Sequence, residues 1–163
     1  MKIEITRQTG RSRLTCRRED GSFTSENLGP DFPIHDLAHY VVETKFDLPD
    51  GFYGHIRSGM SIQELSDKAV IKKLGMGSWL AEILTRNLQA LTSGACRPEE
   101  YLELVEWEIA SMGEVDIPAM SLPDILEMKA QLEALAVRWD RLRDGETLTL
   151  NFYTQASTKL PTI

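Results

Sequence analysis

Hydrophobic and polar residues alternate near both ends of the chain. Residues 1–8 and 11–18 follow this pattern, with Thr9-Gly10 between them. Because successive side chains of a strand point to opposite faces, a period of two predicts a β-hairpin. Residues 22–25 fit a short third strand, and residues 147–153 alternate in the same way. Strands are therefore expected at both ends of the chain.

Between these strands the hydrophobic residues recur with the helical period of three to four residues. The segments with this period are residues 31–46, 61–67, 78–91, 98–112 and 122–143. Asp31 is the expected N-cap of the first helix, and Ser61 and Glu64 have the spacing of a capping box. Gly54 and Gly59 predict irregular backbone between the first two helices.

The longest predicted helix carries a regular hydrophobic seam. Its members are spaced three and four residues apart: Ile125, Met128, Leu132, Leu135, Trp139 and Leu142. This spacing is typical of two helices that pack nearly parallel to each other. We expect the seam to pack against the 98–112 helix in an intramolecular hairpin. A seam between two copies of the chain, in a homodimer, is the alternative.

An end strand with one apolar face must join a sheet, and the pattern offers only the N-terminal hairpin. The expected fold is therefore α+β: a small antiparallel sheet made of the N-terminal hairpin and the C-terminal strand, with about four or five helices inserted between the strands. The length of 163 residues suits a single domain, 1–163, and is enough to bury a core. Its regions are the hairpin region 1–28, the helical region 31–143 and the strand 146–154.

The composition is typical of a water-soluble protein, with 42% hydrophobic residues, 26% charged residues and a net charge of −7. No apolar run approaches the ~20 residues of a membrane span, and the start shows no signal peptide. We therefore expect a cytoplasmic protein with reduced cysteines and no membrane contact. The negative charge makes nucleic acid an unlikely partner, because most of the surface repels phosphates.

The first 20 residues differ from the rest, since they carry six basic and three acidic residues. Arg11, Arg13 and Arg17 fall on the outer face of the second predicted strand. A row of guanidinium groups suits phosphates or an acidic partner, so these arginines are candidates for partner binding. Charged side chains on a strand also discourage edge-to-edge association, and a solvated face is the interpretation that the sequence favours.

All three histidines lie between residues 35 and 55. His35 and His39 are four residues apart on a predicted helix, so their side chains share one face. This spacing lets two imidazoles reach one metal ion, either zinc or another divalent transition metal. Asp36 follows the first histidine, where a carboxylate can hold and deprotonate a metal-bound water. It is the candidate catalytic residue.

Three residues are candidates for the third metal ligand. His55 is preferred, because neutral imidazole is a common ligand and the glycine-rich segment before it can fold back on the helix. Glu43 continues the histidine face one turn later, and Glu64 lies on the next predicted helix. Without a metal, the two helical histidines would pack against the sheet and donate hydrogen bonds to carbonyl or carboxylate groups.

The stretch PIHDLAHYVVE, followed by LPDGFYGHI, resembles a group of uncharacterised bacterial proteins. In that group a proline, an H-D-x-x-H-Y-x-V-E helix and a downstream D-G-F-x-G turn occur together. The resemblance covers residues 33–54, and the residues that match it are His35, Asp36, His39, Tyr40, Glu43, Asp50, Gly51, Phe52 and Gly54. It implies a bacterial family and brings no reaction with it.

Two functions follow from these patterns. The first is a metal-binding protein, hydrolase-like in its chemistry, which uses His35 and His39 with His55 or Glu43 as the third ligand. The second is a non-enzymatic interaction module without metal, expected to be homodimeric, which works through the helical hairpin or the arginine strand.

Overall fold

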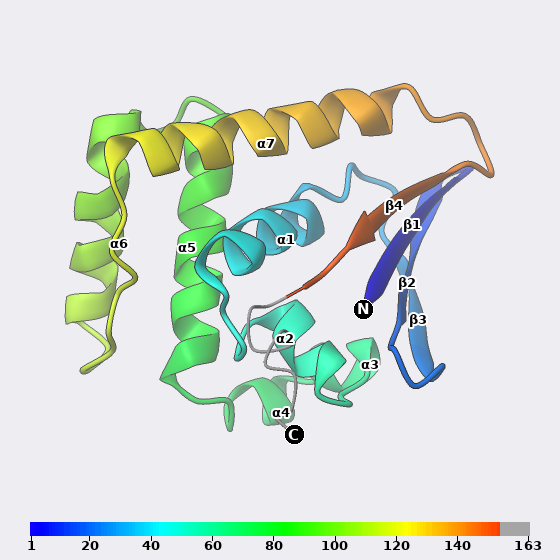
Figure 1. Ribbon diagram of the computed structural model, residues 1–163, viewed down its shortest axis with the longest axis horizontal. Coiled ribbons are helices and arrows are strands. Elements are labelled where there is room, and N and C mark those ends of the chain that lie inside the picture. The colour runs from blue at the N-terminus through cyan, green and yellow to red at the C-terminus, as the bar shows by residue number, and fades with distance from the viewer. Residues whose placement is uncertain (154–163) are drawn as a thin grey trace, which may run out of the picture.

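The computed structural model describes residues 1–153, which form a four-stranded antiparallel sheet beside a group of helices (Figure 1). The strands are β1 (Lys2–Gln8), β2 (Arg11–Arg17), β3 (Phe23–Leu28) and β4 (Thr147–Asn151). They lie in the order β3-β2-β1-β4, so the N-terminal hairpin and the C-terminal strand share one sheet. The α+β fold expected from the pattern is confirmed. Residue 154, the last of the predicted C-terminal strand, lies outside the described residues.

The described chain contains seven α-helices, against the four or five expected. They are α1 (Ile34–Phe46), α2 (Phe52–Arg57), α3 (Ile62–Leu65), α4 (Lys68–Ile71), α5 (Met76–Thr92), α6 (Tyr101–Ala110) and α7 (Leu122–Asp140), with a 3-10 turn, η1 (Pro98–Glu100), before α6. The additional helices are short. The segment 52–57 is helical despite Gly54, whereas the sequence predicted irregular backbone there.

The apolar face of the sheet forms one wall of the core. Ile5 on the central strand pairs with Leu14 on β2 and with Leu148 on β4, and all three side chains are buried. The β1–β2 turn places Gly10 at a φ of 72°, in the left-handed region that glycine tolerates. Alternation of apolar and polar residues therefore sets both the strand pairs and the face that each buries.

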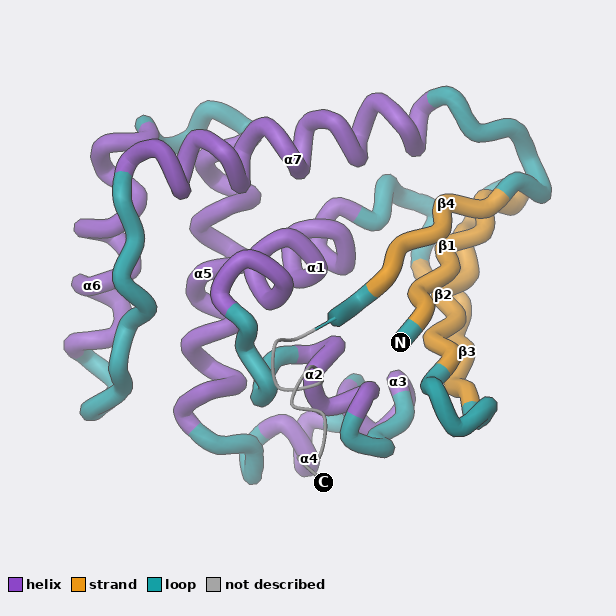
Figure 2. The backbone as a smooth tube through the Cα atoms, viewed as in Figure 1, coloured by secondary structure: helices purple, strands orange, loops and turns teal. Residues whose placement is uncertain are grey.

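Helix α1 lies in the middle of the molecule and packs against α2, α5 and α7 (Figure 2). Its start differs from the expectation, because the helix begins at Ile34 with Pro33 as N-cap and without a side-chain cap. Asp31 lies outside the helix. The capping box at Ser61 and Glu64 is present at the start of α3, as the spacing predicted.

The seam of α7 is buried inside the molecule, and the helix runs along α1 and α5 (Figure 1). Of the 98–112 segment, which was expected to form a hairpin with the seam, η1 contacts α7, whereas α6 packs on α5. The seam therefore pairs with helices that precede it by many residues, and spacing alone does not identify such partners.

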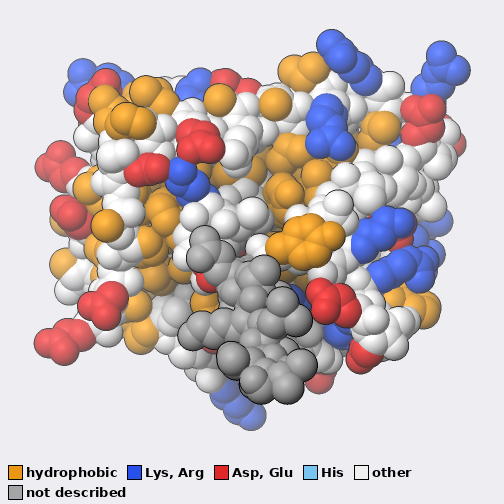
Figure 3. Space-filling view, viewed as in Figure 1, with side chains coloured by type: hydrophobic (Ala, Val, Ile, Leu, Met, Phe, Trp, Pro, Cys, Tyr) orange, Lys and Arg blue, Asp and Glu red, His pale blue; other side chains and the backbone are white. Residues whose placement is uncertain are grey.

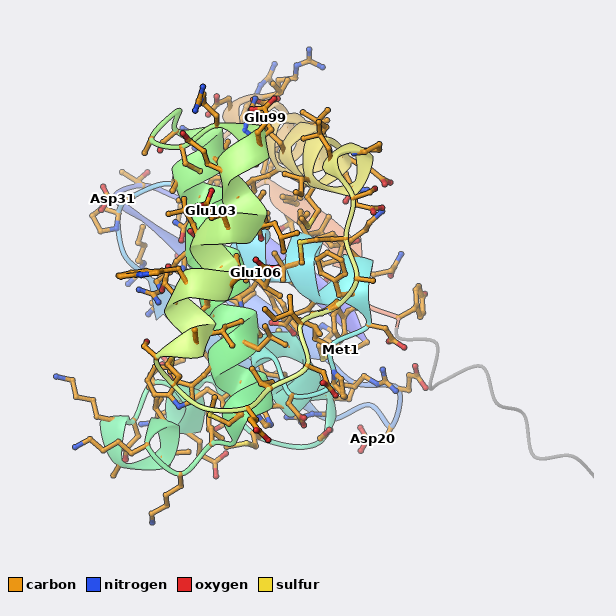
Figure 4. All side chains as sticks on the ribbon, turned by 90° about the vertical axis from the view of Figure 1, so that its left-hand side faces the viewer. Met1, Asp20, Asp31, Glu99, Glu103 and Glu106 are labelled. Carbon is orange, nitrogen blue, oxygen red and sulfur yellow. The ribbon has the colours of Figure 1, made fainter. Side chains whose placement is uncertain are left out.

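Charge is distributed unevenly over the surface. In Figure 3 the Lys and Arg side chains gather mainly over the sheet, on the right, while acidic side chains line the α6 side on the left. Figure 4 faces that left-hand side and shows Glu99, Glu103 and Glu106 on its outer surface. Among the residues described, no helix combines the length and hydropathy needed to span a membrane.

Arg11, Arg13 and Arg17 lie on the outer face of the sheet, where the strand pattern placed them. Each guanidinium Nε donates to a neighbouring side chain, namely that of Gln8, Ser25 and Glu4 respectively. The row is thus satisfied within the sheet, as a solvated face would be.

Candidate metal centre

His35 and His39 lie one turn apart on α1, and α5 brings Glu82 beside them. The two imidazole Nε2 atoms are 3.1 Å apart. Glu82 Oε2 lies 3.2 Å from His39 Nε2 and 3.4 Å from His35 Nε2. These three atoms are the closest group of possible metal ligands in the described part of the chain. Two elements far apart in sequence therefore present two nitrogens and one carboxylate oxygen to the same point.

The spacing of these atoms suits a common metal ion. Metal–nitrogen and metal–oxygen bonds of ~2.1 Å separate adjacent ligand atoms by about 3.0 Å in an octahedral site and about 3.4 Å in a tetrahedral one. The three measured separations, 3.1, 3.2 and 3.4 Å, span this interval. Two histidines and one carboxylate are also a ligand set found in catalytic zinc and non-haem iron sites.

Hydrogen bonds to the two Nδ1 atoms fix the orientation of the imidazole rings and the position of their protons. His39 Nδ1 donates to Glu43 Oε1 at 2.9 Å, and His35 Nδ1 donates to Gln89 Oε1 at 2.8 Å. Because both acceptor atoms lack a proton to give, the ring proton of a neutral imidazole resides on Nδ1 in each case. A neutral ring therefore keeps its Nε2 free to bind a metal ion beside Glu82, and a protonated ring donates from Nε2 to the Glu82 carboxylate. This back-bonding is the usual support of metal-binding histidines.

The side chain of Glu43 is itself held firmly, because it is fully buried and accepts three hydrogen bonds. Its second oxygen, Oε2, accepts hydrogen bonds from the backbone N–H groups of Tyr53 and Gly54, at the start of α2. The backbone of Gly51 passes so close that a Cβ there would lie 2.2 Å from Glu43 Cδ. The D-G-F-x-G turn therefore holds the Glu43 side chain in place, and Glu43 in turn orients His39.

The electrostatics of the group favour a positive charge at its centre. Burial alone would lower the pKa of His39, but hydrogen bonds to Glu43 and Glu82 outweigh it and raise that pKa to about 9. The hydrogen bond to Glu82 likewise raises the pKa of His35. Hydrogen bonds from His35 and His39 hold the pKa of Glu82 well below its usual range. A proton occupies this position when no metal ion does.

The group opens onto a cavity of about 490 Å³. Asp36 lines this cavity beside the histidines, and burial raises the pKa of its carboxyl group. His55 lines it as well, but its Nε2 donates to Ser78 Oγ at 2.7 Å, and that hydroxyl donates to the backbone oxygen of Asp50. His55 is thus directed to a different partner in the same cavity.

The structure brings together some of the residues that the sequence singled out. His35 and His39 meet as predicted, and Asp36 lies with them at the cavity wall. The third member of the group is Glu82, not His55, Glu43 or Glu64. Glu64 serves as the capping partner of Ser61, so its carboxylate is engaged elsewhere.

The sequence did contain a sign of Glu82, because this is the only acidic residue in the predicted helix 78–91. A carboxylate on a helix that buries an apolar stripe needs a partner or an exposed position. No family model, curated protein or solved structure matches the chain. The interpretation of the group therefore depends on its own geometry.

Proposed function

We propose that the protein binds one divalent transition metal ion through His35, His39 and Glu82. The observation that supports it is the convergence of two imidazole Nε2 atoms on one carboxylate oxygen, with both Nδ1 atoms engaged by Glu43 and Gln89. A proton between these atoms relieves their mutual repulsion, and a metal ion that displaces the proton would do the same. Zinc is the best fit, since it accepts nitrogen and oxygen ligands and tolerates three protein ligands.

The reaction class that this centre favours is hydrolysis. Three protein ligands leave a position open to water and substrate, and a bound ion polarises a carbonyl group and lowers the pKa of water. Asp36 lies at the wall of the same cavity, where its carboxylate can take a proton from the attacking water. The roles are thus metal ligand for His35, His39 and Glu82, and general base for Asp36.

Metal binding is tested first by removing bound metal with a chelator, adding zinc and measuring stoichiometry and affinity by competition. Wild-type protein should bind one equivalent. Glu82→Gln and His35→Ala should weaken zinc binding by at least ~100-fold. Loss of a hydrogen-bond partner behind a ligand already lowers metal affinity 10- to 100-fold, and these two variants change a direct ligand. Gln89→Ala should weaken it less, within that interval.

His55→Ala is the matched control, since it removes a histidine from the same cavity and leaves the three ligands in place. It should bind zinc as the wild type does. Asp36→Asn should also keep the metal but lower hydrolysis of chromogenic acyl esters by about 10²- to 10⁴-fold. Wild-type protein that binds no zinc would contradict the proposal and favour the non-enzymatic interaction module.

A further inference from the structure

We propose, on the basis of the function just assigned, that the substrate of this centre is a neutral carbonyl compound with an extended apolar chain, such as a fatty acyl ester or amide. The supporting feature is the cavity in front of the metal-binding group. Its volume of about 490 Å³ lies within the range of small-molecule sites. A ligand that fits this cavity must match both its polar and its apolar lining.

The cavity has a mixed lining, in which the aliphatic side chains come from other elements than the metal-binding group, while Phe52 on α2 and Trp79 on α5 add aromatic surface. The metal-binding group and Asp36 come from α1 and α5. The end of β3 and the segment from α3 to Leu74 supply a wall that contains Ser66 and is otherwise aliphatic, with Leu28, Ile62, Leu65, Ile71 and Leu74. A ligand with one polar end and one apolar chain satisfies both walls, because burial of a chain on the aliphatic side removes apolar surface from water.

The charges of the cavity select a neutral polar end. In the described part of the chain, no lysine or arginine lines the cavity, whereas Asp36 and Glu82 do. Two carboxylates balance the charge of a divalent ion, so no positive charge is left over for a phosphate or a second carboxylate. Sites that bind phosphate normally supply arginine, lysine or helix N-terminal amides. An uncharged carbonyl group needs no positive side chain to balance it.

The reaction for such a substrate balances without any further reagent. Water adds to the carbonyl carbon, whose oxygen a bound metal ion would polarise, and gives one proton to the Asp36 carboxylate. The bond from carbon to the leaving oxygen or nitrogen then breaks, and Asp36 returns the proton to that atom. The products are a carboxylic acid and an alcohol or amine.

The experiment measures binding of straight-chain hydroxamic acids, from acetohydroxamic to octanohydroxamic acid, to the zinc-loaded protein. They share one head group, which is uncharged in neutral solution and gives up a proton when it chelates zinc, so only the chain varies along the series. Each added methylene should tighten binding roughly three- to fourfold until the cavity is full, as expected for burial of a CH₂ group. Octyl phosphate should compete more weakly than octanohydroxamic acid.

A pair of neighbouring variants shows where the chain lies. Ile71→Asn makes the aliphatic wall polar at a half-buried position, and Val70→Asn changes the adjacent residue of α4, which does not line the cavity. Ile71→Asn should lose most of the gain from chain length and keep the affinity for zinc and for acetohydroxamic acid. Val70→Asn should behave like the wild type.

The outcomes separate this inference from the proposed function. Normal zinc binding with an affinity independent of chain length, or an unchanged chain-length gain in Ile71→Asn, would overturn the inference and leave the metal site standing. Tighter binding of octyl phosphate than of octanohydroxamic acid would overturn the neutral head group. Absence of zinc binding would overturn both.

Discussion

Glu43 shows how a single buried carboxylate organises the candidate site. Its two oxygens accept three hydrogen bonds, one from His39 and two from the backbone at the start of α2. These donors offset the desolvation of a buried charge, because hydrogen bonds to ionised groups are the strong ones. The same residue thereby fixes the imidazole of His39 and the position of the following turn, so site geometry and local fold depend on one side chain.

The space beside Glu43 gives a prediction for Gly51. In Gly51→Ala the new Cβ would overlap Glu43, which should destabilise the protein by about 1–3 kcal/mol and weaken zinc binding. Gly75→Ala is the matched control: both glycines are N-caps with extended backbone, at φ −79° and −74°, but nothing lies near a Cβ at Gly75.

Denaturant unfolding of both variants measures this difference. Gly75→Ala should stay within about 1 kcal/mol of the wild type, since it keeps the backbone angles and meets no side chain. Equal losses in the two variants would mean that the N-cap position, rather than contact with Glu43, sets the cost.

At the scale of elements, α7 illustrates what amphipathic spacing predicts and what it leaves open. The residues Ile125, Met128, Leu132, Leu135 and Trp139 are all buried, as the three-and-four spacing indicated. Their partners are α1 and α5, whereas the sequence suggested α6. A hydrophobic stripe identifies the face that a helix buries, but the partner depends on the path of the intervening chain.

The seam gives a prediction about stability. Leu132 is fully buried and Leu126 is 45% exposed on the same helix. Leu132→Ala should lower the free energy of unfolding by about 2–5 kcal/mol, because it removes methyl groups from the core and leaves a cavity. Leu126→Ala should change it by less than about 0.5 kcal/mol. Similar effects in both variants, measured by denaturant titration, would contradict this packing.

The sequence predicted the strands and the longer helices because their periods are local. It missed α2, where glycines mask a short helix whose first backbone amides bind Glu43. It found His35 and His39, which share one helix, and missed Glu82, which lies on α5. The place of Glu82 beside the histidines follows from the α1–α5 contact, and no spacing within either segment encodes that contact.

At the scale of the whole molecule, the centre links stability to pH. His39 faces Glu43 from its own helix and Glu82 from α5, with His35 beside it. In the metal-free protein the pKa of His39 is raised from 6.5 to about 9. The folded state therefore holds this proton more tightly than the unfolded chain, and the resulting stability is complete below pH 6.5 and lost as the pH rises through about 9.

Thermal unfolding of chelator-treated protein across this interval tests the linkage. The midpoint should fall as the pH rises from about 6.5 to about 9. His39→Gln should show a flatter dependence, whatever its absolute stability. Added zinc should stabilise the wild type more at the upper end of the interval, since the ion displaces the proton. An identical slope in wild type and His39→Gln would contradict the assignment.

The place of β1 in the middle of the sheet has a consequence for the order in which the chain folds. β1 meets β2 across a two-residue turn, but it meets β4 only after every described helix has been synthesised. Pairs this distant in sequence form slowly, and an unpaired strand edge invites association with other chains. His35, His39 and Glu82 all precede β4, so a nascent chain can bring the proposed metal ligands together while one edge of β1 is still unpaired. Early metal capture would then stabilise the helical part during the interval in which the growing protein is most exposed to aggregation.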